Sequence, residues 1–287
     1  NWLLVESGNI EEILALHIWD HALIGTPASP LRKALIDSGL GEDLTGSGFQ
    51  TGYRQTMYSV GLKGVVEQNT EKVERLILET LTEIAEKGFD PETLRASLNT
   101  VEFSLRENNT GSYPRGLVMM LNAVENWVYG HNPIDALAFE APLNAIKQRF
   151  QAGERFFENL IRQHFLENPH RVSLVLRPDP QLGQQRAAVE QQRLQQARAQ
   201  MTPQQIEEIV QVTRELKRRQ ETPDSPDALA TIPMLTRADL EPKIKNIPSE
   251  EIHLAESNIL YHDLFTNGIL YLDLGFDLHT LPQEWLP

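Results

Sequence analysis

The stretch NIEEILALHIWDHALIG, residues 9–25, predicts a helix that organises the N-terminal half of the chain. Asn9, followed three residues later by Glu12, is a helix-start signal, and Gly25 is a helix-stop signal, so we expect a helix over about residues 10–24. One face of this helix carries, at the i, i+3, i+4, i+7 spacing, Ile10, Ile13, Leu14, His17, His21 and Ile24. The pattern predicts that both histidines point into the protein.

The two histidines raise the question of a metal site. Histidines four residues apart on a helix lie about 5–6 Å from each other and can share a metal ion. In the H-x-x-E-H motif of zinc hydrolases, the carboxylate beside the second histidine activates the metal-bound water, whereas the shorter Asp20 stands there in this chain. A site made by His17 and His21 would also need a third ligand, for which Glu102 is the candidate. The alternative, which we favour, is that both are hydrogen-bonded histidines of the core or of a domain interface.

The composition excludes several classes of protein. The 287 residues are 40% hydrophobic, which is enough for a sizeable core. The chain has no cysteine, so disulfides and thiolate metal sites are excluded. A formal charge of −14 argues against nucleic-acid binding and mildly favours cationic partners. No run of about 18 apolar residues and no signal peptide is present, so we expect no membrane partner and a soluble protein of the cytoplasm or an organelle matrix.

Strand and helix signals alternate up to about residue 178 and predict an α+β domain over residues 1–178. Strands are expected at residues 1–5, 57–65 (MYSVGLKGV) and 171–177 (RVSLVLR). Four capped helices are expected between the last two strands: one between Thr70 and Gly88, one from Pro91, one that starts within residues 108–116 after the cap Ser112 and runs to Gly130, and one from Pro133.

The composition changes after residue 178. Residues 181–220 predict two antiparallel helices joined at Met201-Thr202, with a capping box at Thr202 and a narrow apolar stripe. The proline-rich residues that follow predict a linker, so residues 179–250 form a helical hairpin with an extended connection. Residues 251–287 end in a predicted strand, residues 269–276, whose apolar face consists of Leu270, Leu272, Leu274 and Phe276.

The two ends of the sequence shape a further expectation. The chain starts inside a predicted strand without an initiator methionine, and the strand at residues 269–276 has nothing after it to pair with. We therefore expect a piece of a longer polypeptide whose remaining domains are its main partners. The unpaired terminal strand is expected to pack on the α+β domain or to drive self-association.

Four long stretches resemble the middle portion of the presequence proteases, a branch of the pitrilysin and insulin-degrading-enzyme zinc peptidases. They are residues 1–44 (NWLLVESGNIEEILALHIWDHALIGTPASPLRKALIDSGLGEDL), 57–65, 101–137 (VEFSLRENNTGSYPRGLVMMLNAVENWVYGHNPIDAL) and 264–282 (LFTNGILYLDLGFDLHTLP). The resemblance implies a pitrilysin-type sheet-and-helix domain, then the helical hairpin, then the first strand of a further domain. It also implies a parent enzyme in which two halves enclose a chamber where unfolded peptides are cut.

The resemblance places the catalytic zinc motif in a domain that this chain does not contain. The helix with HIWDH would correspond to the zinc helix of that catalytic domain, but its first histidine position is usually aliphatic, so His17 is a departure. We therefore expect no catalytic residue and no bound metal here, although zinc belongs to the parent enzyme. The sequence does not predict which residues bind substrate.

Two other functions remain open at this point. The chain could be a stand-alone helical scaffold or protein-interaction module, with the hairpin as its binding element. It could also be a hydrolase that works through HIWDH, with His17, His21 and Glu102 as ligands.

Overall fold

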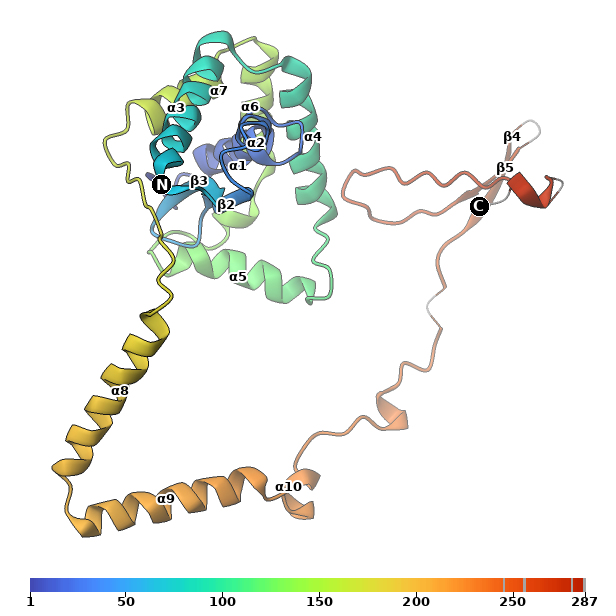
Figure 1. Ribbon diagram of the computed structural model, residues 1–287. Helices are drawn as coiled ribbons and strands as arrows, with labels where there is room; N and C mark the ends of the chain where they lie inside the picture. The colour runs from blue at the N-terminus through green and yellow to red at the C-terminus, as the bar shows by residue number, and fades with distance from the viewer. Residues whose placement is uncertain (245, 255–256, 280, 286–287) are drawn as a thin grey trace. The chain divides into compact units, whose positions relative to one another are not determined.

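The computed structural model describes residues 1–244, 246–254, 257–279 and 281–285 (Figure 1). The chain divides into two compact units, one made of Asn1–Val175 together with Leu264–Pro287 and one made of Leu176–Asp263. Among the described residues, none of the helices combines the length and the apolar character that a membrane span requires.

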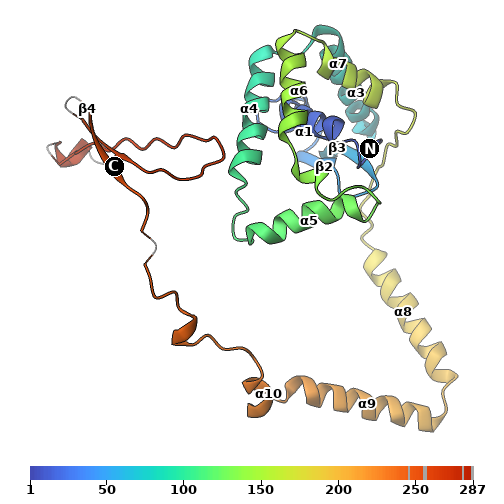
Figure 2. The same ribbon diagram turned by 180° about the vertical axis from the view of Figure 1, so that it is seen from behind.

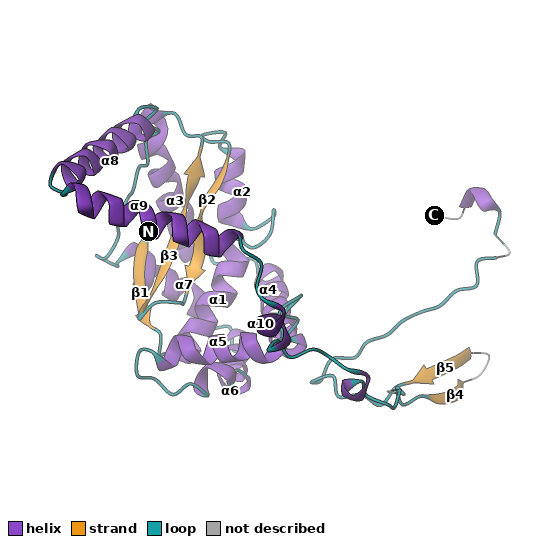
Figure 3. Ribbon diagram, turned by 90° about the horizontal axis from the view of Figure 1, so that it is seen from below, coloured by secondary structure: helices purple, strands orange, loops and turns teal. Residues whose placement is uncertain are grey.

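The first unit combines a three-stranded antiparallel sheet with a group of helices, as the α+β prediction requires. The strands β1 (Trp2–Glu6), β2 (Asp43–Gln50) and β3 (Gln55–Lys63) lie side by side in the order β1-β3-β2 (Figure 3). The helices are α1 (Ile10–Ile24), α2 (Pro30–Asp37), α3 (Thr70–Lys87), α4 (Pro91–Glu107), α5 (Arg115–Trp127), α6 (Glu140–Gln151) and α7 (Phe156–Ile161). Short turns of helix are η1 (Glu67–Asn69), η2 (Asp135–Leu137) and the π-helical η3 (Arg162–Leu166).

Aromatic side chains fasten α1 to the sheet. Strand β3 is central, and its Tyr58 is paired with Trp2 on β1 and with Phe49 on β2. Trp19 of α1 stacks on Phe165 at 4.3 Å between ring centroids and meets Tyr58 edge-on at 5.1 Å. Pairs of this geometry contribute about 0.5–1.5 kcal/mol each beyond the burial of their area. Trp19 is therefore a main anchor of α1 in the core.

Helix α1 has the predicted bounds, but the predicted buried face is only partly right, because most of its residues are half-buried and His17 is exposed. The residues that are buried are Leu14, Ala15, Leu16, Ile18, Trp19, Ala22 and Leu23. Of the predicted face only Leu14 is among them; His17 is exposed and His21 is half-buried. The helix is apolar on nearly all sides, so the spacing of apolar residues does not determine which side is most deeply covered.

Strand β2 was not predicted, because its sequence DLTGSGFQ is rich in glycine. Gly46 and Gly48 have φ angles of +97° and +64°, in the region that side chains rarely adopt. A Cβ on Gly46 would lie 2.4 Å from the carbonyl oxygen of Ser59 on β3. The register shifts between Thr45 and Gly48, which marks a bulge that glycine makes possible.

Two predicted elements of the first unit begin or end differently. The helix expected from Pro133 starts at Glu140, after the short turn η2. The strand expected at residues 171–177 is reduced to a single bridge between Arg171 and Trp2. Val172 still exchanges hydrogen bonds with Asn1, but residues 173–177 lie outside any strand and are exposed.

The second unit contains the two predicted helices as α8 (Leu182–Ala199) and α9 (Pro203–Glu221), followed by the short α10 (Pro226–Ala230) and η4 (Arg237–Asp239). The capping box at Thr202 is confirmed. Neither α8 nor α9 has a buried residue, so the structure does not show them packed as a closed hairpin. An antiparallel pair, β4 (Glu250–Leu254) and β5 (Ser257–Tyr261), ends this unit.

The strand predicted at residues 269–276 is not formed. These residues are outside any strand, and Leu270, Leu272, Leu274 and Phe276 are exposed, because no strand in the described ranges pairs with them. The strand that lies nearest to residues 269–276 in the sequence is β5. A short turn of helix, η5 (Gln283–Trp285), follows.

Candidate functional site

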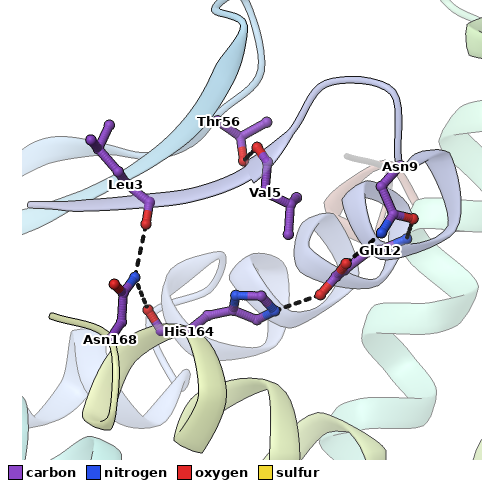
Figure 4. A network of polar contacts seen from close by, with 7 residues as sticks. All are labelled: Leu3, Val5, Asn9, Glu12, Thr56, His164 and Asn168. Carbon is purple, nitrogen blue, oxygen red and sulfur yellow. Dashed lines mark hydrogen bonds and ion pairs between the residues drawn. The ribbon is translucent and has the colours of Figure 1, made fainter. Parts of the chain in front are cut away.

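The N-terminal end of α1 is held by a network of polar contacts (Figure 4). The Asn9 side chain accepts from the Glu12 backbone N–H, and its amide donates to Glu12 Oε2 at 2.5 Å. Glu12 Oε1 lies 2.6 Å from Nε2 of the buried His164 in η3. The amide of Asn168 then donates to the carbonyls of Leu3, on β1, and of His164. This network joins α1, β1 and η3 and so fixes the position of the HIWDH stretch.

His17 has one side of its ring against the sheet. Its ring meets Phe49 of β2 edge-on, with centroids 4.9 Å apart. Neighbouring protein atoms on this side partly desolvate the ring and lower the pKa of His17, which favours the neutral imidazole although the residue as a whole is exposed.

His21 is bound to α4 instead of facing an open site. Its Nδ1 lies 3.0 Å from the hydroxyl of Ser97, which is buried. Its backbone carbonyl accepts from the Gly25 backbone N–H at 2.9 Å and from the Ser29 hydroxyl at 3.4 Å. His21 therefore joins α1 to α4 and to the turn that follows α1.

Asp20 lies against β2, and its side chain faces the bulge. A Cβ on Gly48 would lie 2.8 Å from Asp20 Oδ1, so the carboxylate occupies the space that this glycine leaves. Burial raises the pKa of Asp20 to about 6, against the opposing effects of the Phe49 backbone N–H and the Tyr58 hydroxyl. Burial, and then the Asp20 charge, raise the pKa of Tyr58. Among the described residues, neither Asp20 Oδ1 nor the Tyr58 hydroxyl has a partner at good hydrogen-bond geometry.

Glu102 is held by two cations on α4 and α6, which lie next to each other in Figure 2. Its carboxylate accepts from Arg106 Nε at 3.0 Å and forms a close ion pair with Lys147. Burial would raise the pKa of Glu102, but the hydrogen bonds from Lys147 and Arg106 outweigh it and lower the pKa. Glu102 is therefore a structural ion-pair partner between two helices.

The structure does not bring His17, His21 and Glu102 together as a ligand set. Each has a different partner: the Phe49 ring, the Ser97 hydroxyl and the Arg106–Lys147 pair. Within the described ranges, no group of three or more His, Asp or Glu residues is arranged to hold a metal ion. That the chain binds no metal remains a prediction for solution measurement.

Sequence reasoning missed two contacts. The first is the Glu12–His164 pair, which joins residues 152 positions apart. The second is the contact of Asn267 with Arg106, 161 positions apart. No local pattern predicts either contact, because each depends on which segments the fold brings together.

Comparisons with known proteins give the family. A family model described as the peptidase M16 inactive domain matches residues 1–101, and one described as associated with subfamily C of the M16 peptidases matches residues 176–287. Presequence protease 1, chloroplastic/mitochondrial, of Arabidopsis thaliana is 44% identical over 290 residues, which cover 100% of this chain and 27% of the relative. Protein HypA of Clostridium perfringens is 31% identical over 287 residues, covering 100% of this chain and 29% of the relative.

A third relative is the mitochondrial presequence protease of Xenopus laevis, which is 29% identical over 288 residues. The match covers 100% of this chain and 28% of the relative. The chain thus spans between a quarter and a third of the length of these curated relatives. Zinc is the metal that the peptidase M16 family implies. The side chains that come nearest to its motif, His17, His21 and Glu102, do not fit a zinc site, because among the described residues no three potential ligands are placed around one point.

The long stretches that resemble presequence proteases, the α+β architecture and the two matching family models agree. The predicted resemblance is confirmed over the whole chain, and the match with an inactive domain supports the prediction of a non-catalytic role. The N-terminal part of the chain matches the inactive domain of the peptidase M16 family, and the whole chain is similar to the presequence proteases.

Proposed function

We propose that the chain serves as a non-catalytic part of a zinc metalloendopeptidase that degrades short unfolded peptides. The observation that carries this proposal is that His17, His21 and Glu102 contact separate partners and that the described residues contain no set of ligands arranged for a metal ion. The match with an inactive peptidase domain and the names of the relatives support it. Zinc, the catalytic motif and the remaining domains belong to the rest of the enzyme in this proposal.

The three predicted segments of the chain have different roles in this proposal. Residues 1–178 form part of the wall of the peptide chamber, residues 179–250 act as the hinge, and residues 251–287 begin the next domain. The hinge role is supported by the absence of buried residues from α8 and α9, since segments with few packing contacts open and close at low cost. In the whole enzyme, shortening residues 221–233 (ETPDSPDALATIP) should change kcat and KM together. Unchanged kinetics would make the segment a passive tether.

The names of the relatives support a proposal for the compartment and the partners. Presequence proteases named mitochondrial or chloroplastic support a place in an organelle matrix, and the cytoplasm is the alternative where no such organelle exists. The net charge of −14 supports cationic peptides as the substrates that this wall faces. The exposed apolar residues at positions 270–276 are where the isolated chain would self-associate.

Peptide cleavage by the isolated chain tests the non-catalytic role. The chain is incubated with zinc and an unstructured cationic peptide, and the products are analysed by mass spectrometry. No cleavage is expected, because the described residues contain no set of ligands that would hold a metal ion and activate a bound water. Cleavage that a chelator abolishes and that is lost in Asp20→Asn would contradict the proposal and favour a hydrolase acting through HIWDH.

A further inference from the structure

A tight turn near the C-terminal end of the chain contacts the first unit. In the turn Thr266–Ile269, the Ile269 backbone N–H donates to the Thr266 carbonyl at 3.2 Å, and the Thr266 hydroxyl donates to the Ile269 carbonyl at 2.6 Å. Asn267 and Gly268 have φ angles of +53° and +81°. Positive φ at both central residues is the signature of the type I′ turn, for which Asn-Gly is the preferred sequence. The turn is therefore specified by its own residues.

The turn lies at the C-terminal end of α4. The last carbonyls of a helix have no partner within the helix and lie at the negative end of its dipole, so they accept from external donors. The Asn267 side-chain amide donates to the Arg106 carbonyl at 3.1 Å. In return, Arg106 Nη1 donates to the Asn267 carbonyl at 3.4 Å. Asn267 thus caps a helix 161 residues earlier in the chain.

Arg106 is held in place by contacts other than the turn. Its Nε donates to Glu102 at 3.0 Å, and Glu102 also pairs with Lys147 of α6. The Arg106 guanidinium lies over the ring of Phe139, at 5.8 Å from the centroid. Because these contacts fix the side chain, docking the turn costs little further ordering of the receptor.

Burial in this part of the chain is confined to the turn. Of the described residues between 250 and 285 whose exposure is given, only Thr266, Asn267 and Ile269 are partly covered. The flanking Phe265 and Leu270 are 94% and 88% exposed. One further contact follows the turn, where the Tyr271 hydroxyl donates to Glu107 Oε1 at 3.4 Å. The chain therefore meets α4 through a specific contact and not through general apolar collapse.

We propose that the turn Thr266–Ile269 is a docking element for the C-terminal end of α4, with Arg106 as its receptor residue. Docking holds the chain after residue 263 on the same compact unit as residues 1–175. Residues 176–263 then form a loop with both ends attached to that unit, and α8 and α9 can move only within this closed loop. This inference concerns the isolated chain and does not depend on the proposed protease function.

Cross-linking tests the contact directly, because the chain has no cysteine of its own. The variant Glu107→Cys with Tyr271→Cys is treated with a short bismaleimide, and the rate of intramolecular linkage is followed by gel mobility and peptide mass spectrometry. The same pair is then measured with Asn267→Gly added. Glycine keeps the positive φ of the turn but removes the amide that donates to Arg106.

We expect rapid linkage in the starting pair and about a fivefold slower rate with Asn267→Gly, the factor that corresponds to one net hydrogen bond. Asp273→Gly, which adds the same flexibility to an exposed position of the same segment, is the control and should leave the rate unchanged. Slow linkage in the starting pair would overturn the proposal. So would equal rates with and without Asn267→Gly. Unchanged circular dichroism shows that the variants are folded, and faster amide exchange at residues 104–108 in Asn267→Gly is the independent readout.

Discussion

His21 Nδ1 lies 3.0 Å from the hydroxyl of Ser97, and this contact joins the helix that carries HIWDH to α4. Metal-binding histidines often hold their second ring nitrogen in such a hydrogen bond, so the observation against a metal site is that no three His, Asp or Glu side chains of the described residues are arranged to hold one ion. The second histidine of the apparent zinc motif is therefore part of the packing between two helices.

Removing the Ser97 hydroxyl should destabilise the fold. Ser97→Ala leaves the half-buried His21 nitrogen without its partner, and we expect a loss of about 1–2 kcal/mol in the free energy of unfolding. Urea denaturation measures this change. Ser104→Ala, an exposed serine on the same helix, is the matched control and should stay within about 0.5 kcal/mol of the parent. Equal losses in the two variants would show that the contact with His21 contributes nothing.

Asp20 should make stability depend on pH in an unusual direction. Its pKa is raised from 3.8 to about 6, so between these values the folded chain holds a proton that the unfolded chain releases. Stability from this group is therefore highest below about pH 4, falls as the pH rises to about 6, and stays constant above that. Asp20→Asn has no carboxyl group at this position, so its stability should not show this decrease as the pH rises.

Urea midpoints of the parent and Asp20→Asn at about pH 4.5 and about pH 7.5 isolate the effect, because all other groups titrate in both proteins. From the lower to the higher pH, the free energy of unfolding of Asp20→Asn should rise by about 1–2 kcal/mol relative to that of the parent, as expected for a pKa shift of this size. An identical difference at both pH values would mean that the carboxylate is ionised without penalty.

The Glu12–His164 pair should be worth more than a surface ion pair. Because the His164 side chain is only 8% exposed, Glu12→Ala leaves a buried ring nitrogen without its acceptor. We expect a loss of about 2 kcal/mol. Glu11→Ala, in the same first turn of α1, has only a long 4.0 Å contact with Arg149 and should cost under about 0.5 kcal/mol. Similar midpoints for the two variants would refute the special role of the pair.

Gly46 is expected to tolerate no side chain. Its φ of +97° and the clash that an added Cβ would make with the Ser59 carbonyl oxygen predict that Gly46→Ala costs about 2–3 kcal/mol. Gly52→Ala is the control, because nothing lies within 4 Å of its Cβ position and its φ is not in the positive range. Thermal unfolding of both variants checks the prediction, and a stable Gly46→Ala variant would show that the bulge can rearrange.

The sequence predicts most helices of this chain because their ends are marked by local signals. The cap at Asn9, the proline after Asp90 and the box at Thr202 each lie where the structure has a helix start. Strand β2 escaped prediction because its glycines serve the bulge against β3, a long-range requirement. The strand predicted at residues 269–276 failed for the opposite reason, since its alternating pattern has no neighbouring strand among the described residues.

The candidate site shows a second reason why a local sequence pattern does not predict the structure completely. The i, i+4 spacing of His17 and His21 is real, but a helix that is apolar on nearly all sides does not reveal which side is covered. His17 was therefore placed in the core, although it is exposed. The partners that engage the three candidate ligands come from β2, α4 and α6, and only the fold brings them into contact.

Zinc stoichiometry is the most direct test of the non-catalytic role. The purified chain is dialysed against micromolar zinc and then against metal-free buffer, and bound metal is measured by mass spectrometry with inductively coupled plasma. We predict substantially less than one zinc per chain, unchanged by His17→Ala, because the histidines and Glu102 are bound to separate partners. One tightly held zinc per chain, lost in His17→Ala, would contradict the account.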